Sequence, residues 1–165
     1  MPKIYAFIPA RSGSERVKDK NIKKLHGKPL IEYTIEQAKS SKLITKTYIS
    51  TDYKNLNSKI NINEDVKVII RPKNISKNTS LDIDWILHLL KKIKNDMPDL
   101  IVLLRPTSPF RNYEFIDISI KKLLAKKDYD SARAVTLVKE HPDKMWIKEG
   151  EKIIPLSGFN KTGED

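Results

Sequence analysis

The chain has 165 residues with 32 Lys and Arg against 21 Asp and Glu, which gives a formal net charge of +11. Its length fits one domain, the absence of cysteine excludes disulfides and thiolate metal sites, and no apolar run approaches the ~20 residues of a membrane helix. The N-terminal residues have no signal-peptide pattern, so the sequence predicts a cytoplasmic protein without membrane contact. The charge favours an anionic partner, although a lysine-rich bias along the chain accounts for part of it.

Short apolar runs alternate with amphipathic stretches along the sequence. They predict strands at 3–9, 45–52, 66–72, 100–106 and 131–138, and helices at 29–42, 81–94 and 114–127. The first strand is expected to end at Pro9, and 100–106 is apolar enough for a central strand covered on both faces. Two short extended segments are expected around Glu149 and Gly150. This alternation predicts an α/β fold, a mostly parallel sheet flanked by helices, with residues 1–165 in a single domain.

Charged segments follow three of the predicted strands. They are ARSGSERVKDKN, RPKNISKNTS and RPTSPFR, residues 10–21, 71–80 and 105–111. Ligands of open parallel sheets bind beyond the carboxyl ends of the strands, so charge placed there favours a binding site over a solvated surface. Asp52 ends a fourth predicted strand, where it could hold a metal ion or a ribose, or cap a helix.

The first of these segments carries small residues among cations. It is neither a Walker A loop nor a G-x-G-x-x-G turn, but the backbone N–H groups of residues 12–14 could approach an anion. At an effective dielectric constant of about 20, a cation about 4 Å from a unit charge gains roughly 4 kcal/mol. A triphosphate cradle and a basic surface loop both fit this segment. Its cations are Arg11, Arg16, Lys18 and Lys20.

The second segment joins a predicted strand to the predicted helix at 81–94. Arg71 and the hydroxyls of Thr79 and Ser80 suit the reading of a base edge or a phosphate. The same two hydroxyl residues are placed to cap the following helix. The apolar stripe predicted for that helix consists of Ile83, Ile86, Leu87, Leu90 and Ile93.

The third segment, RPTSPFR, combines two prolines with two arginines. Because proline fixes φ, Arg105, Thr107 and Ser108 would be held rigidly, either in a binding loop or in a purely structural turn. The three histidines of the chain have no metal-ligand spacing. The aromatic residues are not interleaved with basic ones, so nucleic acid is not predicted as a partner.

Taken in order, these segments resemble the acylneuraminate cytidylyltransferase family, the CMP-sialic acid synthetases and their relatives. The matching pieces are IPARSGSERVKDKNIKKLHGKPLIEYTI, STD, RP with a polar loop and TS, LLRPTSPFR and HPDKMW. They follow the family's order at compatible spacing across nearly the whole chain. Deoxy-octulosonate cytidylyltransferases have a related opening, but RSGS…DKN and RPTSPFR are more similar to the acylneuraminate branch.

The resemblance implies a Rossmann-like nucleotide-diphospho-sugar transferase fold. It also implies transfer of CMP from CTP to the anomeric hydroxyl of a nonulosonic acid, an acidic nine-carbon sugar, with release of pyrophosphate, assistance by Mg²⁺ and a homodimeric enzyme. Carried over by position, it implies catalytic contacts to phosphate from Arg11 and Lys20, nucleotide binding by Ser12, Gly13, Ser14, Asn21, Arg71, Thr79 and Ser80, and sugar binding by Arg105, Thr107 and Ser108.

Three features depart from the family pattern. Glu15 and Arg16 stand where the family usually has Lys-Gly, and Arg105 stands where many sialic acid synthetases have Gln, which predicts a different sugar such as legionaminate or pseudaminate. The family's C-terminal portion, with dimer contacts and an acidic pair for the catalytic metal, is expected to be missing from residues 1–165, so no metal ligand is assigned. A catalytically inactive nucleotide- or sugar-binding fragment is therefore an alternative, and non-specific polyanion binding is another that rests on charge alone.

Overall fold

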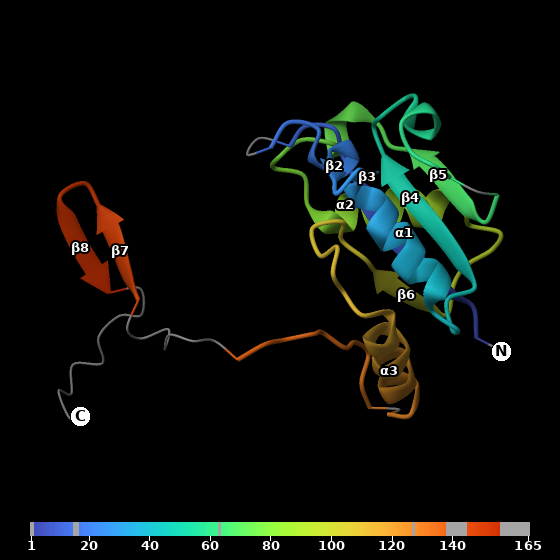
Figure 1. The fold of residues 1–165 in the computed structure, drawn as a ribbon. Helices are drawn as coiled ribbons and strands as arrows, with labels where there is room; N and C mark the ends of the chain where they lie inside the picture. Colours follow the sequence, from blue (N-terminus) through green and yellow to red (C-terminus); the bar gives the residue numbers. More distant parts are fainter. Residues whose placement is uncertain (1, 15–16, 63, 127, 138–144, 156–165) are drawn as a thin grey trace. The chain divides into compact units, whose positions relative to one another are not determined.

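The computed structural model describes residues 2–14, 17–62, 64–126, 128–137 and 145–155 (Figure 1). The chain divides into two compact units, residues 1–130 and 131–165, and the organisation as a single domain stays a prediction. No helix in the described ranges is both long and apolar enough to cross a membrane.

The first unit is built on a four-stranded sheet in the order β5-β4-β1-β6, and every pair in it is parallel. The order reverses at β1, because β4 and β5 follow on one side of it and β6 lies on the other. The carboxyl ends of all four strands therefore meet at one edge, with a crevice beside the end of β1 where ligands of such sheets bind. The strands are β1 (Ile4–Ala10), β4 (Lys46–Thr51), β5 (Val66–Ile70) and β6 (Leu100–Leu103).

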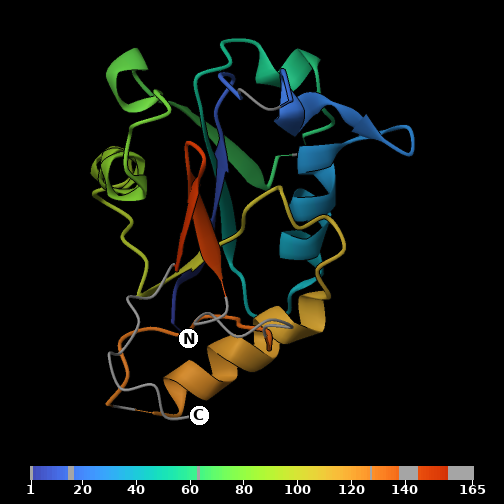
Figure 2. The ribbon, with the colours of Figure 1, turned by 90° about the vertical axis from the view of Figure 1, so that its left-hand side faces the viewer.

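Helices cover both faces of this sheet (Figures 1 and 2). The even-numbered residues of β1 pack into one core with α1 and α3, whereas Tyr5 and Phe7 pack into a second core with Trp85 and Leu89 of α2. Alternating burial on both faces is what a central strand requires, and the layered α/β prediction is confirmed. The helices are α1 (Leu30–Ser40), α2 (Asp82–Lys92) and α3 (Tyr113–Leu124).

Short elements order the connections of the sheet. Between β1 and α1, the strands β2 (Lys24–Leu25) and β3 (Lys28–Pro29) form a hairpin. Its turn uses two residues with positive φ, His26 at 46° and Gly27 at 80°, a conformation that glycine adopts without strain. Three 3₁₀ turns complete the connections, η1 (Lys20–Ile22), η2 (Leu56–Ser58) and η3 (Lys73–Ile75).

Two strand predictions need correction. β1 continues through Pro9 to Ala10 instead of ending at the proline. The proline is tolerated because β6 pairs with β1 only as far as Phe7, so Pro9 has a paired strand, β4, on one side alone. β6 was expected to be central and covered on both faces. Among the described strands it pairs with β1 alone, and its last residue, Leu103, is 46% exposed.

The beginning of α2 also differs from the prediction. The helix starts at Asp82 directly after Leu81, so neither Thr79 nor Ser80 is its N-cap. The carboxylate of Asp84 accepts a hydrogen bond from the backbone N of Leu81 at 3.0 Å, whereas the Ser80 hydroxyl accepts one from the backbone N of Lys77 at 3.1 Å. The helix start is thus stabilised by a carboxylate of the first turn, which accepts from the backbone N of the N-cap residue, and not by the preceding hydroxyls.

The buried face of α2 is rotated from the predicted stripe. Ile83 and Leu87 are 51% and 57% exposed, whereas Trp85 and Leu89 are buried against the sheet. The tryptophan is the larger apolar side chain, so burying it and the leucine one turn later removes more apolar surface from water.

The second unit contains a hairpin of β7 (Trp146–Glu149) and β8 (Lys152–Pro155). The expected turn is confirmed, with Gly150 at a φ of 63° in the two-residue connection. The strand predicted at 131–138 is wrong over 131–137, which have no regular structure. Val135 and Leu137 are 88% and 95% exposed, so the alternating pattern there buries no apolar face. Most of HPDKMW lies outside the described residues.

Candidate active site

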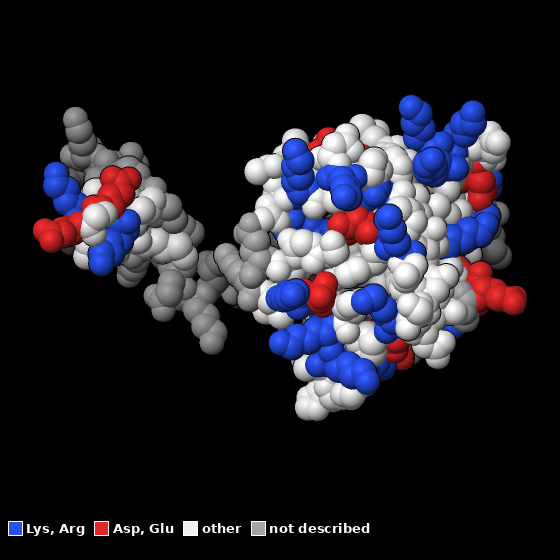
Figure 3. Space-filling model, turned by 90° about the horizontal axis from the view of Figure 1, so that it is seen from above, with Lys and Arg blue, Asp and Glu red and all other residues white. Residues whose placement is uncertain are grey.

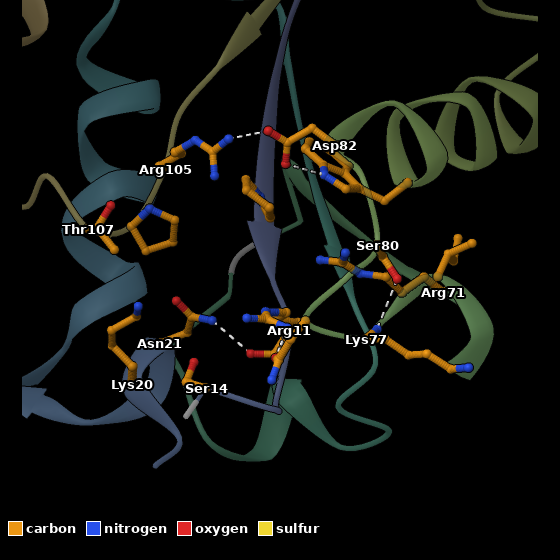
Figure 4. A pocket seen from close by; sticks show the side chains of 15 residues that line it. Arg11, Ser14, Lys20, Asn21, Arg71, Lys77, Ser80, Asp82, Arg105 and Thr107 are labelled. Carbon is orange, nitrogen blue, oxygen red and sulfur yellow. Dashed lines mark hydrogen bonds and ion pairs between the residues drawn. The ribbon is translucent and has the colours of Figure 1, made fainter. Parts of the chain in front are cut away.

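An open pocket of about 270 Å³ lies beyond the carboxyl ends of the strands (Figure 4). It is the region that the reversal of strand order predicts for a ligand. The lining residues are Pro9, Arg11, Ser14, Lys20 and Asn21 at and after the end of β1; Arg71, Ile75, Lys77, Asn78 and Ser80 between β5 and α2; Asp82 and Trp85 of α2; and Arg105, Pro106 and Thr107 after β6.

The lining is strongly cationic. Among the described lining residues the only carboxylate is Asp82, which accepts hydrogen bonds from the guanidinium of Arg105 and, at 3.0 Å, from the indole Nε1 of Trp85. Seen from the carboxyl edge of the sheet, Lys and Arg side chains surround the acidic ones on the first unit (Figure 3). Such an excess raises the local concentration of an anionic ligand. The cations that line the pocket are Arg11, Lys20, Arg71, Lys77 and Arg105.

Asp52, at the end of β4, holds the loop that follows β1. Its two carboxylate oxygens accept hydrogen bonds from the backbone N and the Oγ of Ser12, each at 2.7 Å. Asp52 does not cap the 3₁₀ turn η2, whose N-cap residue is Asn55. The side chain thus fixes the first residues of the loop, a use that the sequence did not reveal.

The neighbours of Asp52 hold the same loop at two further points. The Thr51 hydroxyl donates to the carbonyl of Ala10 at 2.7 Å, and the Tyr53 hydroxyl donates to the carboxylate of Asp19 at 2.8 Å. Asp19 has a φ of 53°, a left-handed conformation that persists only where surrounding contacts hold it. Burial, followed by the hydrogen bond to Asp19, raises the pKa of Tyr53 above its usual value, so this phenol stays a donor. Residues 51–53 together act as a clasp on the first loop.

Side chains within the pocket tie its segments together. Asn21 is 5% exposed, and its Nδ2 donates to the carbonyl of Arg11 at 2.9 Å. The guanidinium of Arg11 donates in turn to the side-chain oxygen of Asn78 (Figure 4). The loop after β1 and the segment after β5 therefore meet across the pocket.

Arg71 is a buried cation in the wall of the pocket. It is 5% exposed, its Nη2 donates to the carbonyl of Ser50 at 2.8 Å, and its guanidinium lies 5.6 Å from the ring centre of Trp85. Burial lowers the pKa of Arg71 below its usual value, but an arginine stays protonated at neutral pH. No described residue accepts a hydrogen bond from its buried Nε. The pocket thus contains a desolvated positive charge with unused donor capacity.

The structure places most of the predicted site residues together. Arg11, Ser14, Lys20, Asn21, Arg71, Ser80, Arg105 and Thr107 line the pocket, whereas Ser12, Gly13, Thr79 and Ser108 are not among its lining residues. The backbone N and the hydroxyl of Ser12 instead donate to the carboxylate of Asp52. Residues 15 and 16, where the sequence departs from the family pattern, lie outside the described residues.

Sequence reasoning missed several lining residues. Lys77 and Asn78 lie inside the charged segment 71–80, but no motif marks them. Asp82 and Trp85 lie in the first turn of α2 and both line the pocket, where the side chain of Asp82 points towards Arg105 (Figure 4). A carboxylate at the start of a helix usually indicates capping, so only its place beside the charged loops could have marked it.

The described residues do not form a metal site by themselves. They contain no group of three or more His, Cys, Asp or Glu side chains that could hold a metal ion. The lining carboxylate, Asp82, is already engaged by Arg105 and Trp85. Mg²⁺ is usually held by one or two carboxylates together with phosphate oxygens, and Asp82 is the carboxylate that the described lining offers.

A parallel sheet whose strand order reverses beside a cationic pocket defines an α/β protein with an anion site at its topological switch point. The chain belongs to the cytidylyltransferase family, whose model matches residues 5–145.

Curated relatives agree with this assignment. The chain is 34% identical over 134 residues to an N-acylneuraminate cytidylyltransferase of Escherichia coli, covering 81% of the chain and 31% of the relative. It is 36% identical over 129 residues to a CMP-N,N'-diacetyllegionaminic acid synthase of Legionella pneumophila, covering 75% of the chain and 55% of the relative. The chain thus spans between about a third and about a half of the length of these relatives.

Solved structures share the fold. A CMP:2-keto-3-deoxy-manno-octonic acid synthetase complexed with CTP superposes with a TM-score of 0.64 at 19% identity, covering 76% of this chain and 49% of that one. Rv0371c of Mycobacterium tuberculosis in complex with manganese gives a TM-score of 0.52 at 11% identity, covering 72% and 58%. The predicted Rossmann-like nucleotidyltransferase fold is confirmed.

Proposed function

We propose that the pocket binds CTP and a nonulosonic acid, and that it transfers CMP from CTP to the anomeric hydroxyl of the sugar. The observation that carries this proposal is the convergence of cations, five against one carboxylate among the described lining residues, in a pocket at the carboxyl edge of the sheet. A triphosphate and an acidic sugar are both anions, so such a pocket suits both substrates. The names of the relatives from Escherichia coli and Legionella pneumophila support the sugar class.

In the proposed reaction, the anomeric oxygen attacks the α-phosphorus of CTP. The new bond joins that oxygen to phosphorus, the bond from the α-phosphorus to the bridging oxygen of the β-phosphate breaks, and pyrophosphate leaves. The hydroxyl proton passes to solvent. Such a transfer depends on positioning and on neutralisation of developing charge, which we assign to Arg11 and Lys20. Of the expected phosphate cradle, Ser14 lines the pocket, whereas Gly13 and Ser12, whose backbone N donates to Asp52, would act through the shape of the loop.

The nucleoside is assigned to the wall between β5 and α2. Arg71 and Ser80 line the pocket there, where the guanidinium of Arg71 offers a positive charge and the side chain of Ser80 a hydroxyl to the base or ribose. Asn21 would act from the opposite wall by fixing Arg11. Thr79, which does not line the pocket, would act only through the turn that it shares with Ser80.

The acidic sugar is assigned to the loop after β6. Arg105 is an exposed guanidinium that can pair bidentately with a carboxylate, and Thr107 lines the same wall. Ser108 would act through the turn in which its backbone N donates to the carbonyl of Arg105 at 3.3 Å. Because Arg105 is paired with Asp82, the carboxylate of the sugar would replace an internal carboxylate.

Arg105 is also proposed to set the preference among nonulosonic acids, with legionaminate or pseudaminate as the substrates that it favours. Arg105→Gln is expected to lower kcat/KM for the preferred sugar about tenfold and to shift the preference towards N-acetylneuraminate. Competition between two sugars at fixed CTP measures that preference. An unchanged preference would contradict this role.

Magnesium is proposed only as the cation that accompanies the triphosphate. When bound there it would neutralise phosphate charge, but the described residues form no group of three or more possible metal ligands, so no step and no ligand is assigned. We also propose a homodimer, on the resemblance alone. The cytoplasmic location stays a prediction.

Pyrophosphate release from CTP and Mg²⁺ with a panel of nonulosonic acids tests the proposed function. Turnover that requires both CTP and one sugar is the expected result, with ATP, GTP and UTP as controls. CTP binding without turnover would identify a binding fragment. Binding to DNA as tight as binding to CTP would identify a general polyanion binder and overturn the proposal.

A further inference from the structure

The two arginines of RPTSPFR have different environments. Arg105 is exposed at the pocket, whereas Arg111 is partly buried six residues later, against α1, and does not line the pocket. Burial lowers the pKa of Arg111 below its usual value. A guanidinium is costly to desolvate unless its donors are used, so the contacts of Arg111 indicate its role.

Arg111 and Gln37 fix the loop at both ends. The Nη2 of Arg111 donates to the carbonyl of Arg105 at 3.1 Å, and its Nη1 donates to the Oε1 of Gln37 at 2.8 Å. The Nε2 of Gln37 donates to the carbonyl of Pro109 at 2.7 Å. Gln37 is only 8% exposed, on the buried face of α1. The loop backbone is therefore tied to a rigid helix through one amide and one guanidinium.

These side chains cannot be exchanged freely. A guanidinium reaches two acceptors from one planar group, whereas a lysine ammonium would have to choose between them. An amide both donates and accepts, which is what the positions between Arg111 and Pro109 require. Between the two tied carbonyls lie Thr107 and Ser108, on the stretch that begins with Arg105.

We propose that Gln37 and Arg111 are positioning residues for the acidic sugar, because they hold residues 105–109 so that Arg105 and Thr107 face the pocket. This inference rests on the proposed function for the sugar. It separates the loop from the nucleotide, whose assigned contacts come from other segments. Loss of the tie should therefore affect the sugar and leave CTP unaffected.

The test compares Arg111→Lys with the wild type in the full 165-residue chain. The KM for the sugar is expected to rise about tenfold, while the KM for CTP and the melting temperature change little. Gln37→Leu should have the same effect, and Gln37→Glu, which keeps the acceptor for Arg111, a smaller one. Arg133→Lys, at an exposed position of the second unit, is the matched control and should change neither constant.

A double-mutant cycle checks that Arg111 acts through the loop. If it positions Arg105, then Arg111→Lys added to Arg105→Ala should have much less effect than in the wild type, because coupled residues are not additive. Additive losses, or an equal rise in both KM values, would overturn the inference.

Hydrogen exchange gives a readout that does not need activity. In Arg111→Lys the amides of Ser108 and Arg111, which bond within the turn at 3.3 Å, should exchange faster, while that of Ile49 in β4 stays unchanged. Unchanged exchange of the amides of Ser108 and Arg111 would contradict the inference that Arg111 holds the loop. Should the wild type lack turnover, the proposed function fails, and the exchange result still decides whether Gln37 and Arg111 hold the loop.

Discussion

The two loops that flank the pocket are held in different ways. The loop after β1 is clasped from outside by three consecutive residues at the end of β4, which reach Ala10, Ser12 and Asp19. The loop after β6 is tied to α1 by Gln37 and by its own Arg111. The ligand-facing groups of each loop lie within one short motif, whereas most of the groups that hold it lie far away in the chain. This difference predicts that damage to the clasp affects the nucleotide and damage to the tie affects the sugar.

The largest effect is expected from Asp52→Ala, which tests whether the residues at the end of β4 act on nucleotide binding. The substitution leaves the backbone N and the hydroxyl of Ser12 without their acceptor. Losing such a pair costs about 2 kcal/mol, or roughly a 30-fold weaker affinity for CTP. Titration calorimetry with CTP measures it, with Asp128→Ala, at an exposed position, as control. An unchanged affinity would mean that the clasp does not shape the cradle.

A smaller effect on the same side is expected from Tyr53→Phe. The ring stays buried, and only the hydroxyl that donates to Asp19 at 2.8 Å is removed. A typical hydrogen bond contributes about 1 kcal/mol net, so the KM for CTP should rise about fivefold. The KM for the sugar at saturating CTP should not move. Tyr129→Phe, at an exposed position, controls for the loss of a phenol, and an equal effect of both variants would contradict the assignment.

The smallest effect on the pocket is expected from Asp96→Asn, at the opposite edge of the sheet. Asp96 accepts hydrogen bonds from Lys46, Lys3 and the Tyr5 hydroxyl, and these bonds, led by Lys46, lower its pKa well below the usual value of 3.8. Folding therefore favours the ionised form, so its contribution to stability is present above about pH 4 and is lost as the pH falls further.

Chemical denaturation across the pH range measures this contribution. Wild type should lose stability on acidification more steeply than Asp96→Asn, while both keep the same KM for CTP. Parallel acid profiles would contradict the contribution of Asp96 to stability. Altered CTP kinetics in the variant would show that Asp96 affects more than stability.

Local pattern was enough for the sheet, the helices and the charged segments, because period and composition are properties of neighbouring residues. It could not show what holds the loops. Ser12 and Asp52 are 40 residues apart, and Gln37 lies 72 residues from Pro109. The sequence therefore allows Asp52 to be a metal ligand, a ribose contact or a cap, and it has no signal that marks Gln37. Residues 131–137 have the alternating pattern of a strand, but their apolar side chains, such as Val135 and Leu137, are exposed and do not pack against a sheet or a helix.

The reversal of strand order at β1 has a consequence for how such a chain can be altered. The loop that follows β1 and the loop that follows its neighbour β6 have separate anchors, so each can be exchanged without the other. If residues 105–111 and the residue at position 37 are replaced together by those of a relative, the sugar preference should change to that of the relative. The binding of CTP should stay unchanged. The topology thus divides the molecule into one part that can diversify and one that can stay constant.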